Sequence, residues 1–288
     1  MIRFEKLNKQ FRRTAVLRDV DLEIARGDRV ALIGSNGAGK TTLIRCLLGE
    51  YLCDGTVAVD GLDPRQHRST VLPRVGFVPQ LPPPLKMPVG QLLNFSASVC
   101  DADVRHMYDV ANRLGLDPDE LKHRPFVKLS GGQKQKLLIS IALGRDADLL
   151  IMDEPAANLD PEARHIFFNL LAERQDESVM LISSHRLDEV ASLVNRVVEM
   201  DQGKVVLDDR EADNVALNSR LHCTIKLQRP EEAFHKAITQ WGFQCDESAT
   251  SWQGMVAGPD RLRFLGVLSR YAGLLAGVQL EEEHNNVA

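Results

Sequence analysis

Residues 34 to 41 read GSNGAGKT, which has the form GxxxxGK[ST] of a loop that holds the phosphates of a nucleotide. Directly before it, residues 29–33 (RVALI) form a short apolar run, as expected for a strand buried in an α/β sheet. After it, residues 42–48 (TLIRCLL) read as a helix whose N-terminal dipole faces the bound anion. Strand, glycine-rich loop and helix in this order predict an α/β protein that binds a nucleoside triphosphate.

The residue types of this loop suit its chemistry. Its three glycines can adopt backbone angles closed to other residues and bring amide N–H groups close to phosphate oxygens. Lys40 supplies a charge for the β- and γ-phosphates, and the Thr41 hydroxyl suits Mg²⁺. We expect the nucleotide to contact the whole stretch: Gly34, Ser35, Asn36, Gly37, Ala38, Gly39, Lys40, Thr41 and Thr42.

A second buried strand carries two acidic residues at its end. Residues 148–154 read DLLIMDE, an apolar run followed by Asp153 and Glu154. Open α/β sheets bind ligands at the carboxyl ends of their strands. We expect Asp153 to hold Mg²⁺, directly or through water, and Glu154 to polarise the water that attacks the γ-phosphate.

The segment LSGGQ at 129–133 predicts the start of a helix. Ser130 and Gln133 have the S-x-x-Q spacing of a capping box, which places the first helical residue at Gly131. With glycine also at 132, the first-turn N–H groups and the positive end of the helix dipole can approach a γ-phosphate. We therefore interpret Ser130, Gly131, Gly132 and Gln133 as a second group of nucleotide contacts.

These motifs, in this order over residues 1 to about 210, resemble the ATP-binding subunit of ABC transporters. Within that family the chain is most similar to the exporter-type group whose permease is a separate chain. The resemblance implies a mixed core sheet with helices, an antiparallel β subsheet and a helical subdomain at about 81–146. It also implies that LSGGQ of one chain completes the ATP site of a second chain, and we expect that second ATPase subunit to be another copy of this chain.

The resemblance assigns further residues one at a time. Gln80 resembles the glutamine that senses Mg²⁺ and the attacking water, and His185 the histidine that contacts the γ-phosphate. Asp160 lies in a loop that reaches the opposite site in the family. Phe11 lies where the family has an aromatic that stacks on adenine, although a single phenylalanine also suits core packing. Because no catalytic position departs from the pattern, we expect an active ATPase.

Composition limits the partners and the location. The chain has 288 residues and a net charge of −5, and no basic run suggests nucleic-acid binding. Its five cysteines form no C-x-x-C pair and suit a reduced cytosol. No apolar run approaches the roughly 20 residues of a membrane span. We therefore expect the chain to lie at the cytoplasmic face of the membrane, bound to an integral-membrane permease that supplies the path.

The segment between Gln80 and Ser130 is where ABC proteins receive a helix of the membrane partner. Five residues are candidates for that docking groove, and they are equally compatible with internal packing: Met87, Pro88, Leu92, Leu93 and Phe95.

A second, smaller domain follows. Residues 211–219 are expected to be a linker, and residues 220–288 alternate as βαββαβ, the ferredoxin-like order of an α+β domain. Its role remains open between a stabilising or dimer-contacting accessory domain and a ligand-sensing one. Four residues in it raise the alternative of a metal site, as in a branch of the family that serves copper-enzyme maturation: His222, Cys223, His235 and Cys245.

Three classes of function are compatible with these patterns. The first is the ATPase of a membrane transporter. The second is an ABC ATPase that energises a membrane complex without moving solute, in a mechanical or signalling role. The third, a soluble ABC protein acting on DNA or ribosomes, usually has tandem cassettes, a coiled-coil insertion or a basic arm, which are missing from this sequence. The membrane partner distinguishes the first two classes, because the ATPase itself does not meet the cargo.

Overall fold

The computed structural model describes residues 1–174, 178–185, 187–191, 193–210, 220–246, 249–257 and 261–282. The chain divides into two compact units. One comprises Met1–His185 and Leu193–Asp209, and the other Arg186–Ser192 and Arg210–Ala288. The predicted linker at 211–219 lies outside the described residues.

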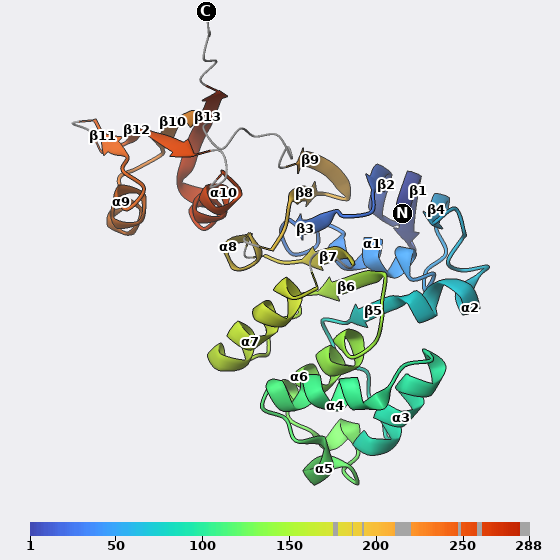
Figure 1. Cartoon of the computed structure of the whole chain (residues 1–288). Coiled ribbons are helices and arrows are strands. Elements are labelled where there is room, and N and C mark those ends of the chain that lie inside the picture. Colours follow the sequence, from blue (N-terminus) through green and yellow to red (C-terminus); the bar gives the residue numbers. More distant parts are fainter. Residues whose placement is uncertain are drawn as a thin grey trace, which may run out of the picture. The chain divides into compact units, whose positions relative to one another are not determined.

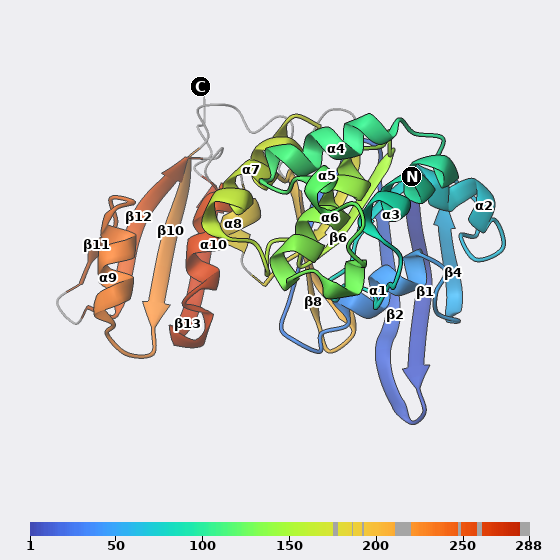
Figure 2. The same ribbon diagram turned by 90° about the horizontal axis from the view of Figure 1, so that it is seen from below.

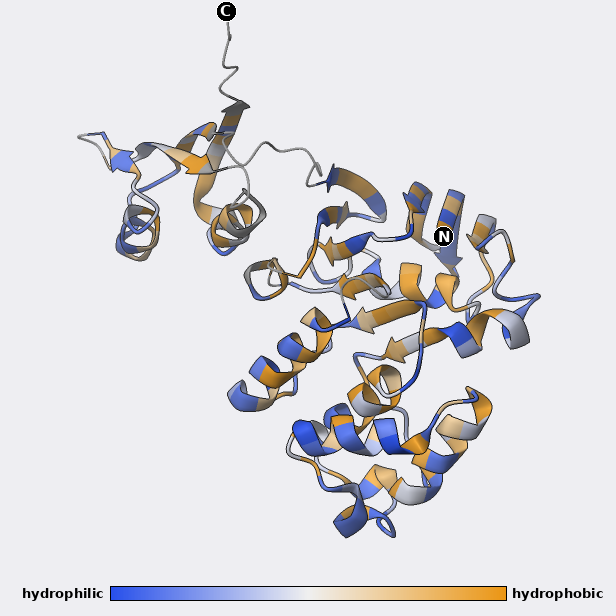
Figure 3. Ribbon diagram, viewed as in Figure 1, coloured by the Kyte–Doolittle hydropathy of each residue, from blue (hydrophilic) through white to orange (hydrophobic). Residues whose placement is uncertain are grey.

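A six-stranded sheet in the order β5-β6-β7-β3-β8-β9 forms the centre of the first unit (Figure 1). The four pairings from β5 to β8 are parallel. Every residue of β6 and β7 is buried, and Figure 3 shows both strands in the hydrophobic colours. The strands are β3 (Arg29–Ile33), β5 (Val75–Val78), β6 (Leu149–Asp153), β7 (Val179–Ser183), β8 (Arg196–Asp201) and β9 (Lys204–Arg210).

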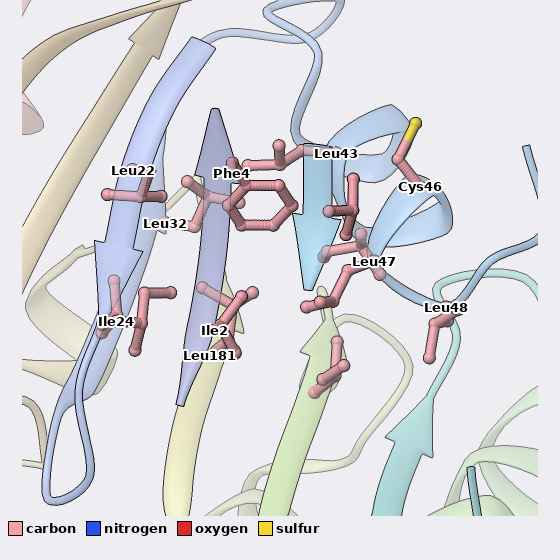
Figure 4. Close-up of a cluster of buried hydrophobic side chains, with 14 of the residues drawn as sticks. Ile2, Phe4, Leu22, Ile24, Leu32, Leu43, Cys46, Leu47, Leu48 and Leu181 are labelled. Atoms are coloured by element: carbon pink, nitrogen blue, oxygen red, sulfur yellow. The ribbon is translucent and has the colours of Figure 1, made fainter. Parts of the chain in front are cut away.

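A three-stranded antiparallel sheet accompanies this core. It consists of β1 (Ile2–Phe11), β2 (Thr14–Ile24) and β4 (Asp54–Val59), with β1 in the middle (Figure 2). Helix α1 (Lys40–Leu47) contributes to the same hydrophobic core, and Figure 4 shows Phe4 of β1, Leu43 of α1 and Leu181 of β7 in one cluster. The mixed core sheet and the antiparallel subsheet confirm the predicted fold class.

The segment between the end of β5 and the start of β6 is mainly helical. They are α3 (Val89–Val99), α4 (Val104–Arg113), α5 (Pro118–Leu121) and α6 (Gly131–Leu143), with a 3-10 turn at Phe126–Lys128 before α6. Helices α3 and α4 contact α6, and α5 contacts α3 and α4 (Figure 1). Leu92 and Leu93, two of the five candidates for partner contact, lie in the hydrophobic core of this subdomain, where Met87 packs partly buried. Phe95 is 57% exposed.

The remaining elements of the first unit are two short elements before β5 and one longer helix, while a further short helix belongs to the second unit. Helix α2 (Arg68–Val71) and the 3-10 turn η1 (Leu72–Arg74) precede β5, and α7 (Pro161–Ala172) connects β6 to β7. Helix α8 (Leu187–Val190), which follows His185, groups with the second unit and contacts α10 there.

The second unit is a four-stranded antiparallel sheet in the order β11-β12-β10-β13. Along the chain its elements are β10 (Arg220–Leu227), α9 (Glu232–Thr239), β11 (Gln244–Cys245), β12 (Ser251–Ala257), α10 (Arg261–Ser269), a 3-10 turn (Ala272–Leu274) and β13 (Leu275–Glu282). Both helices cover the same face of the sheet, and their buried side chains Phe234 and Phe264 pack against Trp252 and Cys223 in one core (Figures 1 and 2). This is the ferredoxin-like arrangement that the sequence pattern predicts.

A buried ion pair fastens the edge of the central sheet. The Arg196 side chain is 6% exposed and donates to Asp28 at 2.8 Å and to both carboxylate oxygens of Asp208 at 2.7 and 2.6 Å. It also donates to the main-chain carbonyl of Glu23 at 2.7 Å. One guanidinium therefore joins β8, β9 and the end of β2, and its fork geometry matches the bidentate Asp208 contact.

We predict that Arg196→Ala lowers the free energy of unfolding by about 3 kcal/mol, because removing one member of a buried ion pair is strongly destabilising and Asp28 loses its contact with the guanidinium. Urea denaturation at neutral pH measures the change. Arg3→Ala is the matched control, since Arg3 pairs with Glu5 on the surface and such pairs contribute at most about 1 kcal/mol. Equal losses in the two variants would contradict a structural role for the buried pair.

Candidate functional site

The loop between β3 and α1 adopts a conformation that requires glycine at two positions. Gly34 has φ +144°, and a Cβ atom there would lie 2.2 Å from the carbonyl oxygen of Met200. Gly39, with φ +109°, is the N-cap of α1. Lys40 is buried, and its Nζ donates to the carbonyl oxygens of Gly34 at 2.6 Å and Ser35 at 3.3 Å. These contacts hold the ammonium against the loop, where the β- and γ-phosphates are predicted to bind.

A pocket of about 290 Å³ opens over this loop. Most of the predicted nucleotide and metal contacts line it together: Ser35, Asn36, Gly37, Ala38, Gly39, Lys40, Thr41, Thr42, Gln80, Asp153 and Glu154. Val16 of β2 also lines the pocket, and the sequence analysis did not identify it. No motif marks this valine, because it is one apolar residue in an alternating strand.

The pairing of β6 with β7 brings the acidic pair to the histidine. Asp153 lies opposite Ser183 in the parallel register, so Glu154 and His185 emerge at the same edge of the sheet. His185 Nδ1 lies 2.7 Å from Glu154 Oε2. An ionised carboxylate only accepts hydrogen bonds, so Nδ1 carries the hydrogen in this contact. The histidine thereby fixes the direction of the carboxylate that is predicted to polarise water.

The pocket offers a donor set that fits Mg²⁺. The Thr41 hydroxyl, the Gln80 amide and the Asp153 carboxylate all line it, and all three present oxygen. Mg²⁺ binds oxygen ligands and commonly takes one or two protein groups together with substrate phosphates. The residues present therefore suit a metal ion that accompanies a bound nucleotide.

Helix α6 begins as the sequence predicts. Ser130 Oγ accepts from the Gln133 N–H at 3.2 Å, and Gln133 Oε1 accepts from the Ser130 N–H at 3.1 Å. Ser130 and Gly131 are exposed, so the first turn of the helix is open to solvent. The capping box is confirmed, while the contact of these residues with a nucleotide stays a prediction.

The start of α6 lines a hollow of its own. This polar hollow of about 260 Å³ is bordered by Ser130, Gly132, Gln133, Lys136 and Asp160, and not by the phosphate-binding loop. Asp160 caps α7 by accepting from the Ala163 N–H, and it pairs with Lys136 at 3.0 Å. The Ala163 N–H and the Lys136 ammonium lower the pKa of the Asp160 carboxyl.

Phe11 does not line the phosphate pocket. Its ring is 40% exposed and packs edge-on against Tyr51 at 5.1 Å, with Lys9 Nζ 4.7 Å from its centroid. The adenine-stacking role of Phe11 therefore stays a prediction.

The structure does not bring the candidate metal-binding residues of the second unit together. Burial raises the pKa of the Cys223 thiol to about 11, and this side chain lies in the helix-covered core. Its neighbour His222 lies on the opposite face of the strand, since side chains alternate, and His235 packs edge-on against Trp252. Among the residues that the structure describes, no group of three or more metal-ligating side chains comes together.

Known proteins are similar to this chain in sequence and in fold. Residues 17–157 match the family model described as ABC transporter. The glutamine transport ATP-binding protein GlnQ of Escherichia coli is 31% identical over 220 residues, which cover 72% of this chain and 90% of GlnQ. The chain belongs to the ABC transporter family of ATP-binding proteins.

Further similarities agree with this membership. The Nod factor export ATP-binding protein I of Cupriavidus pinatubonensis is 30% identical over 235 residues, covering 78% of this chain and 70% of that protein. A solved ATP-binding subunit of an ABC transporter superposes with a TM-score of 0.68 at 25% identity, over 75% of this ABC protein and 91% of that chain. A dimeric ATP-binding cassette bound to ADP and phosphate has the same fold, with a TM-score of 0.64, 20% identity and coverage of 73% and 98%. The protein is thus an ABC ATPase.

We predict that Lys40→Ala raises the dissociation constant for ATP about tenfold or more, because a charge-assisted contact to phosphate is lost. Equilibrium binding of a fluorescent ATP analogue measures this effect. Lys204→Ala, which removes an exposed lysine of β9, is the control. Parental affinity in Lys40→Ala would overturn the assignment of the phosphate-binding loop.

Glu154→Gln is expected to lower the rate of ATP hydrolysis at least about 100-fold while ATP still binds, because the amide no longer takes a proton from water. Steady-state phosphate release and ATP binding, measured on the same preparation, separate the two effects. Glu23→Gln on the exposed face of β2 is the control. Hydrolysis at the parental rate in Glu154→Gln would mean that another residue activates the water.

Proposed function

We propose that this ABC ATPase binds ATP with Mg²⁺, closes as a homodimer around two nucleotides and drives a separate integral-membrane permease at the cytoplasmic face of the membrane, as an exporter. The observation that carries the proposal is the separation of the two nucleotide-contacting groups. The phosphate-binding loop lines one pocket, while Ser130 and Gln133 line another hollow on the same chain.

Both groups are complementary in charge to the negatively charged triphosphate. Lys40 and the amides of the loop face one side of a nucleotide, and the open first turn of α6 presents a positive helix end to the other. A second copy of the chain supplies the missing half of each site. ATP then favours the closed dimer, and hydrolysis removes the ligand that stabilises it.

A groove beside the helical subdomain suits a helix of the permease. It has a volume of about 440 Å³ and a mainly apolar wall that includes Leu72, Phe77 and Val99, with Arg68 and Glu50 among its polar residues. None of the five residues suggested by the sequence lines this groove, and Leu92 and Leu93 are buried in the subdomain core. An amphipathic helix that inserts apolar side chains between charged rims fits such a groove.

Strand β5 and the loop that follows it connect the groove to the ATP pocket. Val75 and Phe77 of β5 line the groove, and Gln80, two residues beyond the end of the strand, lines the ATP pocket. A shift of β5 or of the loop after it would therefore be felt at both sites. We infer that Gln80 links the state of the nucleotide to the position of the docked helix.

Other features support the remaining parts of the proposal. No helix in the parts of the chain that the structure describes is long and apolar enough to cross a membrane. An exporting relative, the Nod factor export ATP-binding protein I, favours export as the direction. We infer that residues 220–288 form an accessory domain joined by residues 211–219. A mechanical or signalling complex, or service to copper-enzyme maturation, is the alternative for the membrane partner.

The experiment is purification of tagged Glu154→Gln from membranes in detergent with ATP, followed by identification of the partner. A multi-spanning protein without large outer domains supports the transporter. A partner with few spans and a large outer domain supports the mechanical alternative. Recovery of ribosomes, DNA or the soluble dimer alone contradicts a membrane partner.

We predict that Val99→Glu in the Glu154→Gln background abolishes recovery of the membrane partner while ATP binding is kept. The exposed Val99 lines the groove, and a carboxylate there would be buried against its apolar wall. Val206→Glu is the matched control, because Val206 is exposed to the same 57% on β9. Full recovery with Val99→Glu would place the docking site elsewhere.

A further inference from the structure

Strand β7 ends in a buried hydroxyl. Its sequence is VMLIS, and the last residue, Ser183, is 0% exposed, like Leu181 and Ile182 before it. A buried polar group is stable only when it is hydrogen-bonded, and an apolar side chain would suit this strand equally well. The position of Ser183 opposite Asp153 therefore requires an explanation from its contacts.

Ser183 contacts both members of the acidic pair. Its Oγ donates to Asp153 Oδ1 at 2.6 Å. The same Oγ accepts from the Glu154 N–H at 3.0 Å, and that N–H also reaches the Ser183 carbonyl oxygen at 3.2 Å. A single hydroxyl thus connects the main chain of Glu154 to the side chain of Asp153.

The first contact selects one oxygen of Asp153. Ser183 donates to Oδ1, so Oδ2 takes no hydrogen bond from this serine and can serve the pocket that Asp153 lines together with Thr41 and Gln80. The hydrogen bond also fixes the plane of the carboxylate. Groups that hold a metal-binding carboxylate in this way commonly affect metal affinity as much as the ligands themselves.

The second contact holds a strained turn. Glu154 has φ +50°, in the left-handed region that residues other than glycine rarely adopt. Its N–H is tied to Ser183, and the carbonyl of the following residue, Pro155, accepts from Gln135 Nε2 of α6 at 2.8 Å. The backbone conformation that directs the Glu154 side chain toward His185 is thus fixed from both sides.

We propose that Ser183 is a positioning residue for ATP hydrolysis, which aligns Asp153 for the metal ion and Glu154 for the attacking water. The residue takes no proton and touches neither nucleotide nor water. Its role concerns hydrolysis within the ATP site, so it holds whichever membrane partner the ATPase drives.

Ser183 could instead have a purely structural role, in which its hydroxyl only satisfies the Glu154 N–H. The two roles predict different measurements. A structural role changes only the stability of the fold, whereas a positioning role changes metal affinity and turnover of the folded protein.

The test compares Ser183→Ala, Ser183→Thr and Ser183→Val. Threonine and valine have nearly the same volume and differ in the hydroxyl, so their difference isolates the hydrogen bonds from added bulk. Ser178→Ala is the control at the other end of the strand, where a buried hydroxyl donates to the Ala147 carbonyl at 2.6 Å, away from the site. Three quantities are measured: the thermal midpoint, the turnover number, and Mn²⁺ affinity by electron paramagnetic resonance with a non-hydrolysable ATP analogue.

We expect Ser183→Ala and Ser183→Val to weaken Mn²⁺ binding and to lower the turnover number, each about tenfold, while metal-free binding of the analogue is unchanged. Ser183→Thr should restore most of both, and Ser178→Ala should alter only the thermal midpoint. If Ser183→Val does not fold, Ser183→Ala against Ser178→Ala decides. Mn²⁺ affinity and turnover within twofold of the parent in Ser183→Ala, or equal losses in the threonine and valine variants, would overturn the proposal.

Discussion

The parallel register of β6 and β7 is the constraint on which the rest of the catalytic centre depends. Asp153 lies opposite Ser183, and this one pairing sets which residues emerge together at the edge of the sheet. A shift by one residue would move the side chains of the shifted strand to the opposite face and break the alignment that brings His185 to Glu154. The four apolar residues that open each strand stabilise the register, because every residue of both strands is buried. Two buried strands thus bring the acidic pair and the histidine together at one edge of the sheet.

The predicted nucleotide contacts also depend on where the fold places them. One chain carries a phosphate-binding loop that faces a pocket and a helix end that opens into a separate hollow. In the dimer that we propose, the nucleotide joins the loop of one chain to the helix end of the other. Loss of the γ-phosphate would then change the assembly, and we propose that a membrane partner docked on the groove beside α3 responds to this change.

Local patterns in the sequence predicted the features that depend on near neighbours. The phosphate-binding loop and the Ser130 capping box involve residues within a few positions of one another, so their spacing suffices. The ferredoxin-like order of the second unit followed from the alternation of its elements. Contacts across the fold were not predictable in this way. Val16 and Ser183 are ordinary strand residues until the sheets place them against the site. Leu92 and Val99 lie on nearly the same side of α3, yet Leu92 is buried in the subdomain core and Val99, at the end of the helix, is exposed.

The most direct test of the two-chain site is sedimentation of Glu154→Gln with and without ATP. The proposed two-chain site predicts one chain without nucleotide and two chains with it, since ATP is retained and bridges the loop of each copy to α6 of the other. Adding Ser130→Arg to the same chain should leave ATP binding intact and abolish the dimer, because the exposed start of α6 would no longer fit against phosphate. A protein that stays a monomer at saturating ATP, or a dimer that is indifferent to Ser130→Arg, would contradict it.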